Sequence, residues 1–259
     1  MTQNERRLWL IRALIRERPE YARMEIPGDH AEQKKLLRAL FNIRMPRPVG
    51  EEFLSVQDAY LQEETRRKGI TDCRSIPPVQ KGISLWRGDI TTLRCGAIVN
   101  AANSQMLGCF YPCHSCIDNA VHTFAGVQLR AECAAFMEKQ GHEEPAGRAK
   151  ITSAYNLPSR YVIHTVGPIV QGGLTDRHRQ ELSSCYRSCL ELAQENDAGS
   201  IAFCCISTGE FRFPNQQAAE IAVRTVKKYL AETDYKLEVI FNVFTERDLS
   251  IYRKLLGAA

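Results

Sequence analysis

The feature that most constrains the fold is a change of pattern after Pro77-Pro78. From there on, short apolar runs rich in β-formers alternate with longer runs of helical periodicity. The expected strands cover residues 83–86, 97–100, 151–154, 161–166, 201–206 and 237–244, and the expected helices cover 117–140, 176–194, 216–231 and 246–256. This alternation predicts a three-layer α/β/α fold with a mixed, mostly parallel central sheet. Run 201–206, IAFCCI, has no polar side, as a strand covered on both faces requires.

Residues 1–80 have a different character. They contain no clear strand, and their apolar residues recur at helical spacing between prolines, which predicts about three helices. We therefore expect an N-terminal helical extension over residues 1–80 and an α/β domain over residues 81–259. The amphipathic pattern of the extension favours packing against the core.

Charge and cysteine usage exclude several classes of protein. The formal net charge is only +4, and Lys and Arg are scattered among Asp and Glu, so the basic stripe of a nucleic-acid-binding protein is missing. The N-terminus lacks the apolar run of a signal peptide or membrane helix, so we expect a cytoplasmic protein without a membrane partner. Thiols stay reduced there, so the ten cysteines do not predict a disulfide framework.

One cysteine cluster needs its own explanation. Within residues 109–116, three cysteines and His114 precede a predicted helix, and thiolate and imidazole are ligands that suit zinc. The spacing is not that of a zinc finger, so the simplest interpretation is a three-ligand site from Cys109, His114 and Cys116, with one position open for water or substrate. Cys113 would need a sharp turn to join it. The alternative is a cluster of reactive or merely buried cysteines.

Polar residues also follow the other expected strands, where ligands bind in such sheets. Asp89 could accept from an adenine amino group or simply cap a turn. Asn103 carries both a donor and an acceptor. Ser207-Thr208-Gly209 precedes a helix and suits a diphosphate, although the spacing is not that of a Walker loop. Phe211 could stack on a sugar or belong to the core.

The start of the helix expected at residue 117 offers free backbone N–H groups for phosphate or sugar oxygens. Asp118 there is a candidate base or water-positioning residue, or else it only stabilises the helix dipole. His164, inside an apolar strand, and His122 are interpreted as structural, because buried polar groups usually find partners. Cys185 and Cys189 are interpreted as core packing.

In combination these segments resemble the macrodomain family. The resemblance rests on Gly88-Asp89-Ile90-Thr91, Asn100-Ala101-Ala102-Asn103-Ser104 and Ser207-Thr208-Gly209, with support from residues 145–152 and 162–168, and it covers about residues 83–257. One segment departs from the family pattern, because residues 108–116 replace the usual glycine-rich phosphate loop. That replacement resembles the zinc-dependent macrodomains of microbes, which also carry an N-terminal helical extension. Glu210 and Arg212 are lesser departures.

The resemblance implies roles for single residues. Asp89 and the Ile90 amide would contact adenine, Asn103 would orient the distal ribose, and zinc would be held beside that ribose. The residues that would surround the diphosphate and distal ribose are Cys116, Ile117, Asp118, Asn119, Ser207, Thr208, Gly209, Glu210 and Phe211.

The expected activity is hydrolysis of mono-ADP-ribosyl groups on protein side chains, O-linked to an acidic residue. ADP-ribose and mono-ADP-ribosylated protein are the expected partners, zinc is the expected cofactor, and Asn103 and Asp118 position the reacting groups. Four alternatives remain: a non-catalytic reader of ADP-ribose, a deacetylase of O-acetyl-ADP-ribose, a zinc ion that only shapes its loop, and an RNA-binding macrodomain.

Overall fold

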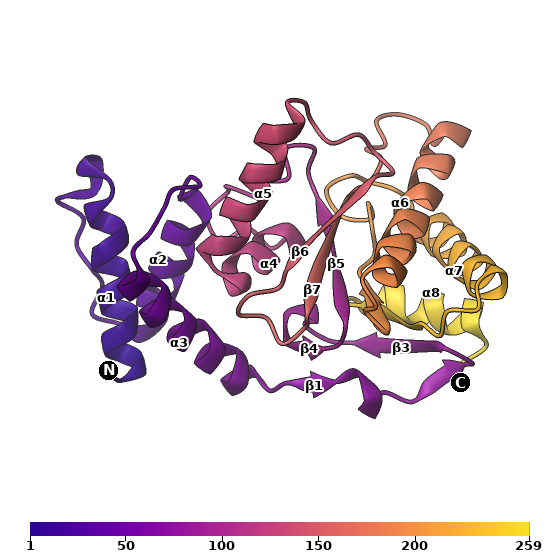
Figure 1. The fold of residues 1–259 in the computed structure, drawn as a ribbon, viewed down its shortest axis with the longest axis horizontal. Helices are drawn as coiled ribbons and strands as arrows, with labels where there is room; N and C mark the ends of the chain where they lie inside the picture. Colours follow the sequence, from indigo (N-terminus) through magenta and orange to yellow (C-terminus); the bar gives the residue numbers. More distant parts are fainter. Residues whose placement is uncertain (259) are drawn as a thin grey trace.

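The computed structural model describes residues 1–258 and is built around one mixed sheet (Figure 1). Seven strands lie in the order β2-β3-β9-β8-β5-β7-β6. The five inner strands pair in parallel, and β2 and β6 close the two edges in the antiparallel sense. The predicted mixed, mostly parallel α/β sheet is therefore confirmed. The strand bounds are β2 Pro78–Gln80, β3 Ile83–Arg87, β5 Ala97–Ala102, β6 Ala149–Ser153, β7 Tyr161–Val166, β8 Ser200–Phe203 and β9 Glu238–Val243.

Helices cover both faces of this sheet (Figure 1). On one side lie α4 (Ile117–Ala125) and α5 (Val127–Gln140), and on the other lie α6 (Asp176–Glu195), α7 (Asn215–Glu232) and α8 (Glu246–Leu256). The central strands are buried on both faces, as their unbroken apolar sequences require. α8 is capped by Thr245, whose hydroxyl accepts from the Asp248 N–H.

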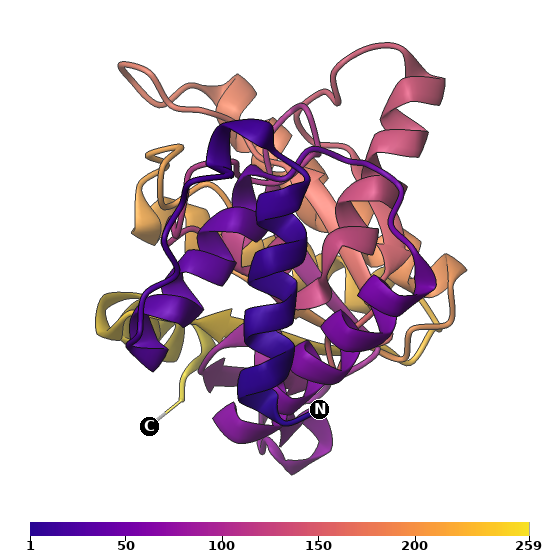
Figure 2. The ribbon, with the colours of Figure 1, turned by 90° about the vertical axis from the view of Figure 1, so that its left-hand side faces the viewer.

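The N-terminal residues form three helices, as the sequence predicted: α1 (Gln3–Arg16), α2 (His30–Ile43) and α3 (Glu51–Lys68). They have a hydrophobic core of their own, made of residues such as Leu10, Leu37 and Leu61. Figure 2 shows α1 as the outermost helix, with α2 and α3 between it and the rest of the molecule. The cysteine-rich loop, residues 107–116, leads into α4. Because α2 and α3 both contact α4, this helical layer lies directly against the helix that follows the loop.

Two short strands precede residue 81, where the sequence predicted none. β2 extends the main sheet, and β1 (Thr71–Asp72) pairs with β4 (Leu93–Arg94) in a separate small sheet. Neither run is long enough to show a two-residue period, so their strand character comes only from their partners.

Two predicted elements differ in extent. The single helix expected over residues 117–140 is two helices, because Gly126 between them has a φ of +98°, which a continuing helix cannot accommodate. The strand expected over 201–206 ends at Phe203. Its ladder with β5 stops at Ala202, while β5 continues beside β7 to Ala102, so residues 204–206 already belong to the loop.

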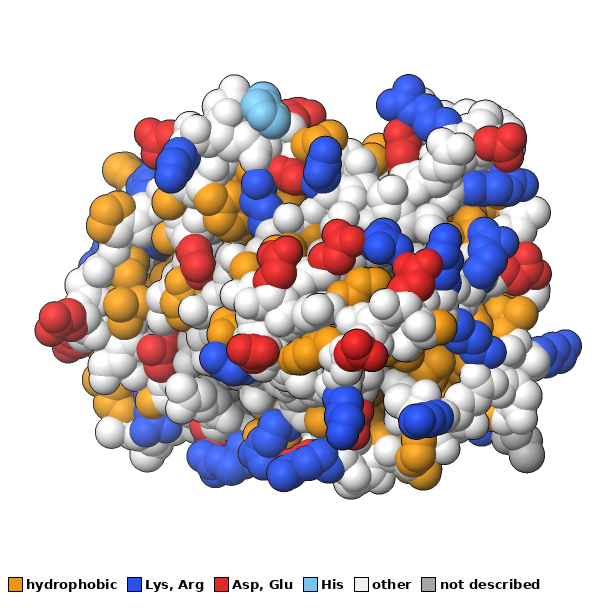
Figure 3. Space-filling view, turned by 45° about the vertical axis from the view of Figure 1, so that its right-hand side comes forward, with side chains coloured by type: hydrophobic (Ala, Val, Ile, Leu, Met, Phe, Trp, Pro, Cys, Tyr) orange, Lys and Arg blue, Asp and Glu red, His pale blue; other side chains and the backbone are white. Residues whose placement is uncertain are grey.

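On the face shown in Figure 3, acidic and basic side chains are interspersed over most of the surface, and several basic side chains gather along its lower edge. Among residues 1–258, none of the helices combines the length and apolar character that crossing a bilayer demands.

Candidate functional site

The carboxyl ends of the parallel strands bring four separate loops together. β3 leads into Asp89, β5 into Asn103, β7 into Gly167 and β8 into Ser207. Two of these loops touch so closely that a Cβ on Gly167 would lie 2.0 Å from the Ser207 hydroxyl oxygen. This is the edge where a doubly covered parallel sheet presents its ligand site.

The two residues expected to position the reacting groups lie side by side. The Asn103 amide donates to the Asp118 carboxylate at 3.3 Å and to the Gly108 carbonyl at 3.1 Å. The other oxygen of Asp118 accepts from Asn100 at 2.8 Å. Burial raises the pKa of Asp118 to about 6, and the Asn100 hydrogen bond opposes that rise. Asp118 is therefore a buried carboxyl group held by two amides.

The three predicted zinc ligands are also brought together. Cys109, His114 and Cys116 each present one ligand atom, and these atoms lie within 4.8 Å of one another. The loop makes this possible by reversing at Cys113, whose φ is +55°, so the chain returns from Cys109 to the start of α4. Cys113 itself points elsewhere, because its thiol donates to the Lys35 carbonyl at 3.4 Å.

The donor set fits a zinc ion. Nδ1 of His114 is buried and has no hydrogen-bond partner among residues 1–258, which is costly unless something else satisfies it. Burial raises the pKa of the Cys116 thiol to about 12, and a bound cation would reverse that effect by stabilising the thiolate. Two thiolates and one imidazole are soft and borderline ligands that zinc prefers. Glu210, from the loop after β8, lies 3.6 Å from Nε2 of His114 and is mostly exposed.

The beginning of α4 is capped by a sulfur atom. Cys116 is the N-cap residue, and its Sγ accepts from the Asn119 N–H at 3.4 Å. The N–H groups of Ile117 and Asp118 have no partner within the described chain, so they remain available to an anion. Asn119 differs from the expected role, since its side chain is fully buried and holds the loop instead of facing a ligand.

The loop after β8 has the geometry of an anion-binding turn. Ser207 and Arg212 adopt left-handed backbone conformations, with φ of +64° and +58°. Between them, the N–H groups of Gly209, Glu210 and Phe211 donate to nothing in residues 1–258. Thr208 turns its hydroxyl back onto the Cys205 carbonyl, so the backbone rather than this side chain is free. Successive free N–H groups in such a turn form a concave site for phosphate oxygens.

Asp89 caps a turn, which is one of the two roles that the sequence left open. Its carboxylate accepts from the N–H and hydroxyl of Thr91 at 3.0 and 2.6 Å, and it pairs with Lys68 of α3 at 3.0 Å. The Ile90 N–H has no hydrogen-bond partner in the described chain. Phe244, which the sequence placed inside a strand, instead follows β9 at the same end of the strands and is 76% exposed.

The structural interpretation of His164 agrees with its contacts. Its ring is fully buried, lies 3.1 Å from the Asn100 amide and 3.0 Å from the Thr152 hydroxyl, and has a pKa lowered by burial to about 3. His122 is also buried. Neither of its ring nitrogens has a hydrogen-bond partner within residues 1–258, and its Nε2 lies 3.6 Å from Oδ1 of Asp118. Cys133 completes a second His/Cys cluster with these two rings, but His164 already uses both nitrogens.

Two arginines that no sequence motif marks also reach this region. Arg38 of α2 and Arg130 of α5 contact the cysteine-rich loop from behind. Arg38 is 76 residues from His114 in the sequence, and Arg130 lies on a helix after α4, so no local pattern linked them to the loop.

Comparison with known proteins supplies the family context. A family model described as "Macro domain" matches residues 99–222. Over 99% of this chain, and all of the relative, the sequence is 58% identical to a protein-ADP-ribose hydrolase of Treponema medium. Identity is 48% to a protein-ADP-ribose hydrolase of Staphylococcus aureus strain MSSA476, covering 98% of this chain and 96% of that protein.

Solved structures agree with the fold. The macrodomain of Trypanosoma brucei in complex with ADP-ribose matches with a TM-score of 0.66 and 31% identity, covering 85% of this chain and 95% of that one. An Oceanobacillus iheyensis macrodomain with ADP matches with a TM-score of 0.63 and 39% identity, covering 70% of this chain and 94% of that one.

Proposed function

This chain belongs to the macrodomain family, and from that premise we propose that it hydrolyses ADP-ribosyl groups from modified proteins. The relatives that match it from end to end are named for this activity. We propose further that the substrate carries a mono-ADP-ribosyl group O-linked to an acidic side chain, and that its hydrolysis depends on zinc.

The observation that carries the proposal is the position of the Cys109, His114 and Cys116 cluster. It lies on the same loop and helix start as Asp118, which Asn103 holds by a hydrogen bond. A ribose above Asn103 would therefore meet both the cluster and the carboxylate. Within residues 1–258 the cluster offers three ligand atoms, which matches a site with an open position better than a filled structural site.

Each loop would bind a different part of ADP-ribose. Asp89 and the Ile90 N–H would take the adenine edge, and the exposed ring of Phe244 offers a flat surface beside them. The free N–H groups of Gly209, Glu210 and Phe211 would hold the diphosphate. The N-terminus of α4 adds its dipole and the two free N–H groups to the same anion.

The reacting bond joins the anomeric carbon of the distal ribose to the protein side chain. Asn103 would fix the ribose, and the Asp118 carboxylate would orient a water molecule toward that carbon and accept its proton. The bond from the carbon to the side-chain oxygen would break as the bond to water forms, and the protein side chain would leave as a carboxylate. Zinc, when bound, would supply a Lewis acid at the ribose. Enclosure by the four loops would keep the reacting groups in one geometry, which is the main gain that a positioned site gives.

Metal removal and restoration on the full chain test the proposal. We expect chelator-treated protein to lose hydrolysis of mono-ADP-ribosylated protein and to regain it with added zinc, while Cys116→Ala stays inactive with zinc present. Full turnover without metal would refute zinc dependence. Tight ADP-ribose binding without turnover would identify a reader, and faster turnover of O-acetyl-ADP-ribose would identify a deacetylase.

A further inference from the structure

The N-terminal helical layer makes polar contacts with the cysteine-rich loop, residues 107–116, on the side of the loop that faces α2. The guanidinium of Arg38 donates to the His114 carbonyl at 2.7 Å and to the side-chain oxygen of Asn119 at 2.7 and 3.2 Å. Asn119 in turn donates to the carbonyls of Tyr111, at 3.0 Å, and Cys109, at 3.4 Å. One arginine of α2 therefore contacts a ligand residue directly and reaches Cys109 through a single buried amide.

A second residue of α2 repeats this arrangement one helical turn later. Asn42 is buried, accepts from the Cys113 N–H at 2.8 Å and donates to the Thr123 hydroxyl of α4 at 2.9 Å. Arg38 and Asn42 are four residues apart, so they share one face of α2, while Leu37 and Phe41 point into the core of the extension. The side of α2 that carries Arg38 and Asn42 therefore contacts the loop and α4.

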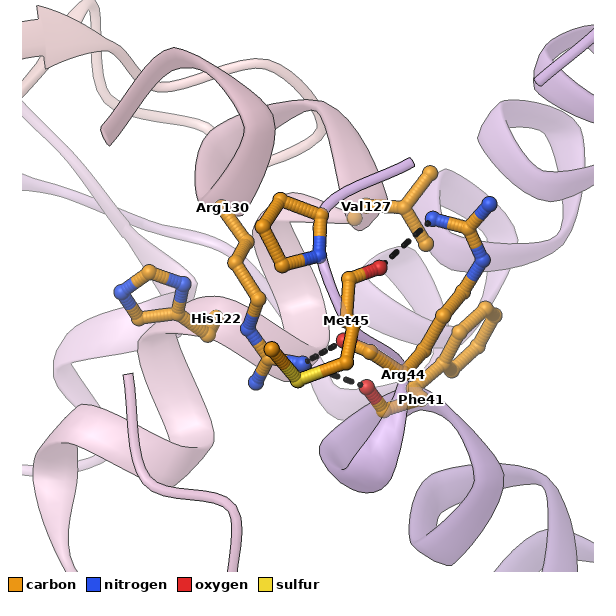
Figure 4. A pocket seen from close by; sticks show the side chains of 8 residues that line it. Phe41, Arg44, Met45, His122, Val127 and Arg130 are labelled. Atoms are coloured by element: carbon orange, nitrogen blue, oxygen red, sulfur yellow. Dashed lines mark hydrogen bonds between the residues drawn. The ribbon is translucent and has the colours of Figure 1, made fainter. Parts of the chain in front are cut away.

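Arg130 of α5 joins the same loop to the C-terminal end of α2. Its guanidinium donates to the Leu107 carbonyl at 2.7 Å and to the carbonyls of Phe41, Asn42 and Arg44, at and just beyond the end of α2. Figure 4 shows this side chain reaching the backbone around Arg44 beside His122. Its guanidinium carbon also lies 4.4 Å from the centre of the Phe110 ring. A cation there satisfies the last carbonyls of the helix and favours its dipole.

We propose that the N-terminal extension is part of the metal site: Arg38 is a positioning residue that fixes His114 and Cys109 in their zinc-binding arrangement. This inference rests on the zinc site proposed above. The loop reverses at a left-handed residue, Cys113, and one of its sides is exposed. Its conformation therefore depends on the hydrogen bonds that α2 and α5 make to the other side. Groups that orient metal ligands typically change metal affinity by about 10- to 100-fold when they are removed.

The test measures zinc affinity of the full chain by competition with a chromophoric chelator, for wild type, Arg38→Ala, Arg38→Lys and Lys34→Ala. Lys34 is the matched control, because it lies on the same helix and pairs with Glu64 of α3 instead of the loop. We expect Arg38→Ala to bind zinc at least about tenfold more weakly, with Arg38→Lys between it and wild type and Lys34→Ala unchanged. Co²⁺-loaded Arg38→Ala should also show a thiolate-to-metal absorption band that differs from that of the wild type.

Activity separates positioning from contact with substrate. Hydrolysis by Arg38→Ala should recover as free zinc is raised, since saturation restores the occupied site. Wild-type zinc affinity and an unchanged Co²⁺ spectrum in Arg38→Ala or, if that variant does not fold, in Arg38→Lys would overturn the inference while leaving the zinc site intact. A wild-type chain that binds no zinc would overturn both.

Discussion

The Asp118 carboxylate accepts a hydrogen bond from the Asn103 amide although the two residues belong to different elements, the loop after β5 and the first turn of α4. The contact joins the loop that we propose to face the ribose to the helix whose N-cap is Cys116. A change at either residue should therefore alter the chemistry more than the binding of ADP-ribose.

Asp118→Asn tests this pair. The new amide cannot accept from both Asn100 and Asn103, and it cannot take a proton from water, so turnover should fall by about 100-fold or more. The affinity for ADP-ribose should change by less than about tenfold, because the proposed base and diphosphate contacts would remain. Initial rates on mono-ADP-ribosylated protein and calorimetric titration with ADP-ribose give the two quantities. Turnover within about twofold of wild type would remove Asp118 from the reaction.

Cys109→Ser and Cys113→Ser should differ in metal content. Cys109 lies in the ligand cluster, whereas the Cys113 thiol is exposed and faces the Lys35 carbonyl. Purified Cys113→Ser should retain about one zinc per chain, and Cys109→Ser should retain little, as measured by plasma mass spectrometry. Equal loss from both variants would show that Cys113 is also a ligand.

Gly108→Ala should destabilise the protein beyond the cost of its backbone conformation. Gly108 has a φ of +80°, and a Cβ there would lie 2.7 Å from Cγ of the buried His122 ring. Gly141 is a matched control, because its φ is +74° and a Cβ there would meet nothing within 4 Å. Gly141→Ala should cost about 1–2 kcal/mol in the free energy of unfolding, and Gly108→Ala about 1–3 kcal/mol more. Denaturant unfolding measures both free energies. Equal losses of stability would mean that the His122 ring moves away from the new methyl group at no cost.

His164 should make the protein less stable in acid. Its pKa is lowered from 6.5 to about 3 in the folded state, so between these values the unfolded chain binds a proton that the folded chain does not. The free energy of unfolding should thus fall by about 1.4 kcal/mol per pH unit from this group as the pH drops below 6.5. His164→Gln should remove that part of the slope, although it also loses native contacts. Burial lowers the pKa of the neighbouring His122 as well, so some slope will remain. An unchanged slope in urea titrations at pH 4.5–6.5 would contradict the expectation.

Much of the fold and site could be predicted from local sequence. Alternating apolar and amphipathic runs predicted the central strands and the helices around them, because burial on two faces demands unbroken apolar strands. The spacing of Cys109, His114 and Cys116 predicted three ligands in one loop, because residues so close in sequence need only one turn to meet. The break at Gly126 was missed, since a single glycine in a helical pattern does not reveal the sign of its φ.

What the sequence determined by itself was the layered α/β architecture and the kinds of side chain placed at each strand end. Only the tertiary structure decided which of these side chains meet, that Asn119 turns inward, and that Arg38 of the N-terminal helices reaches the loop of His114. The reason is physical: periodicity records whether a residue is buried, but a hydrogen bond between residues 76 or more positions apart depends on how whole elements pack.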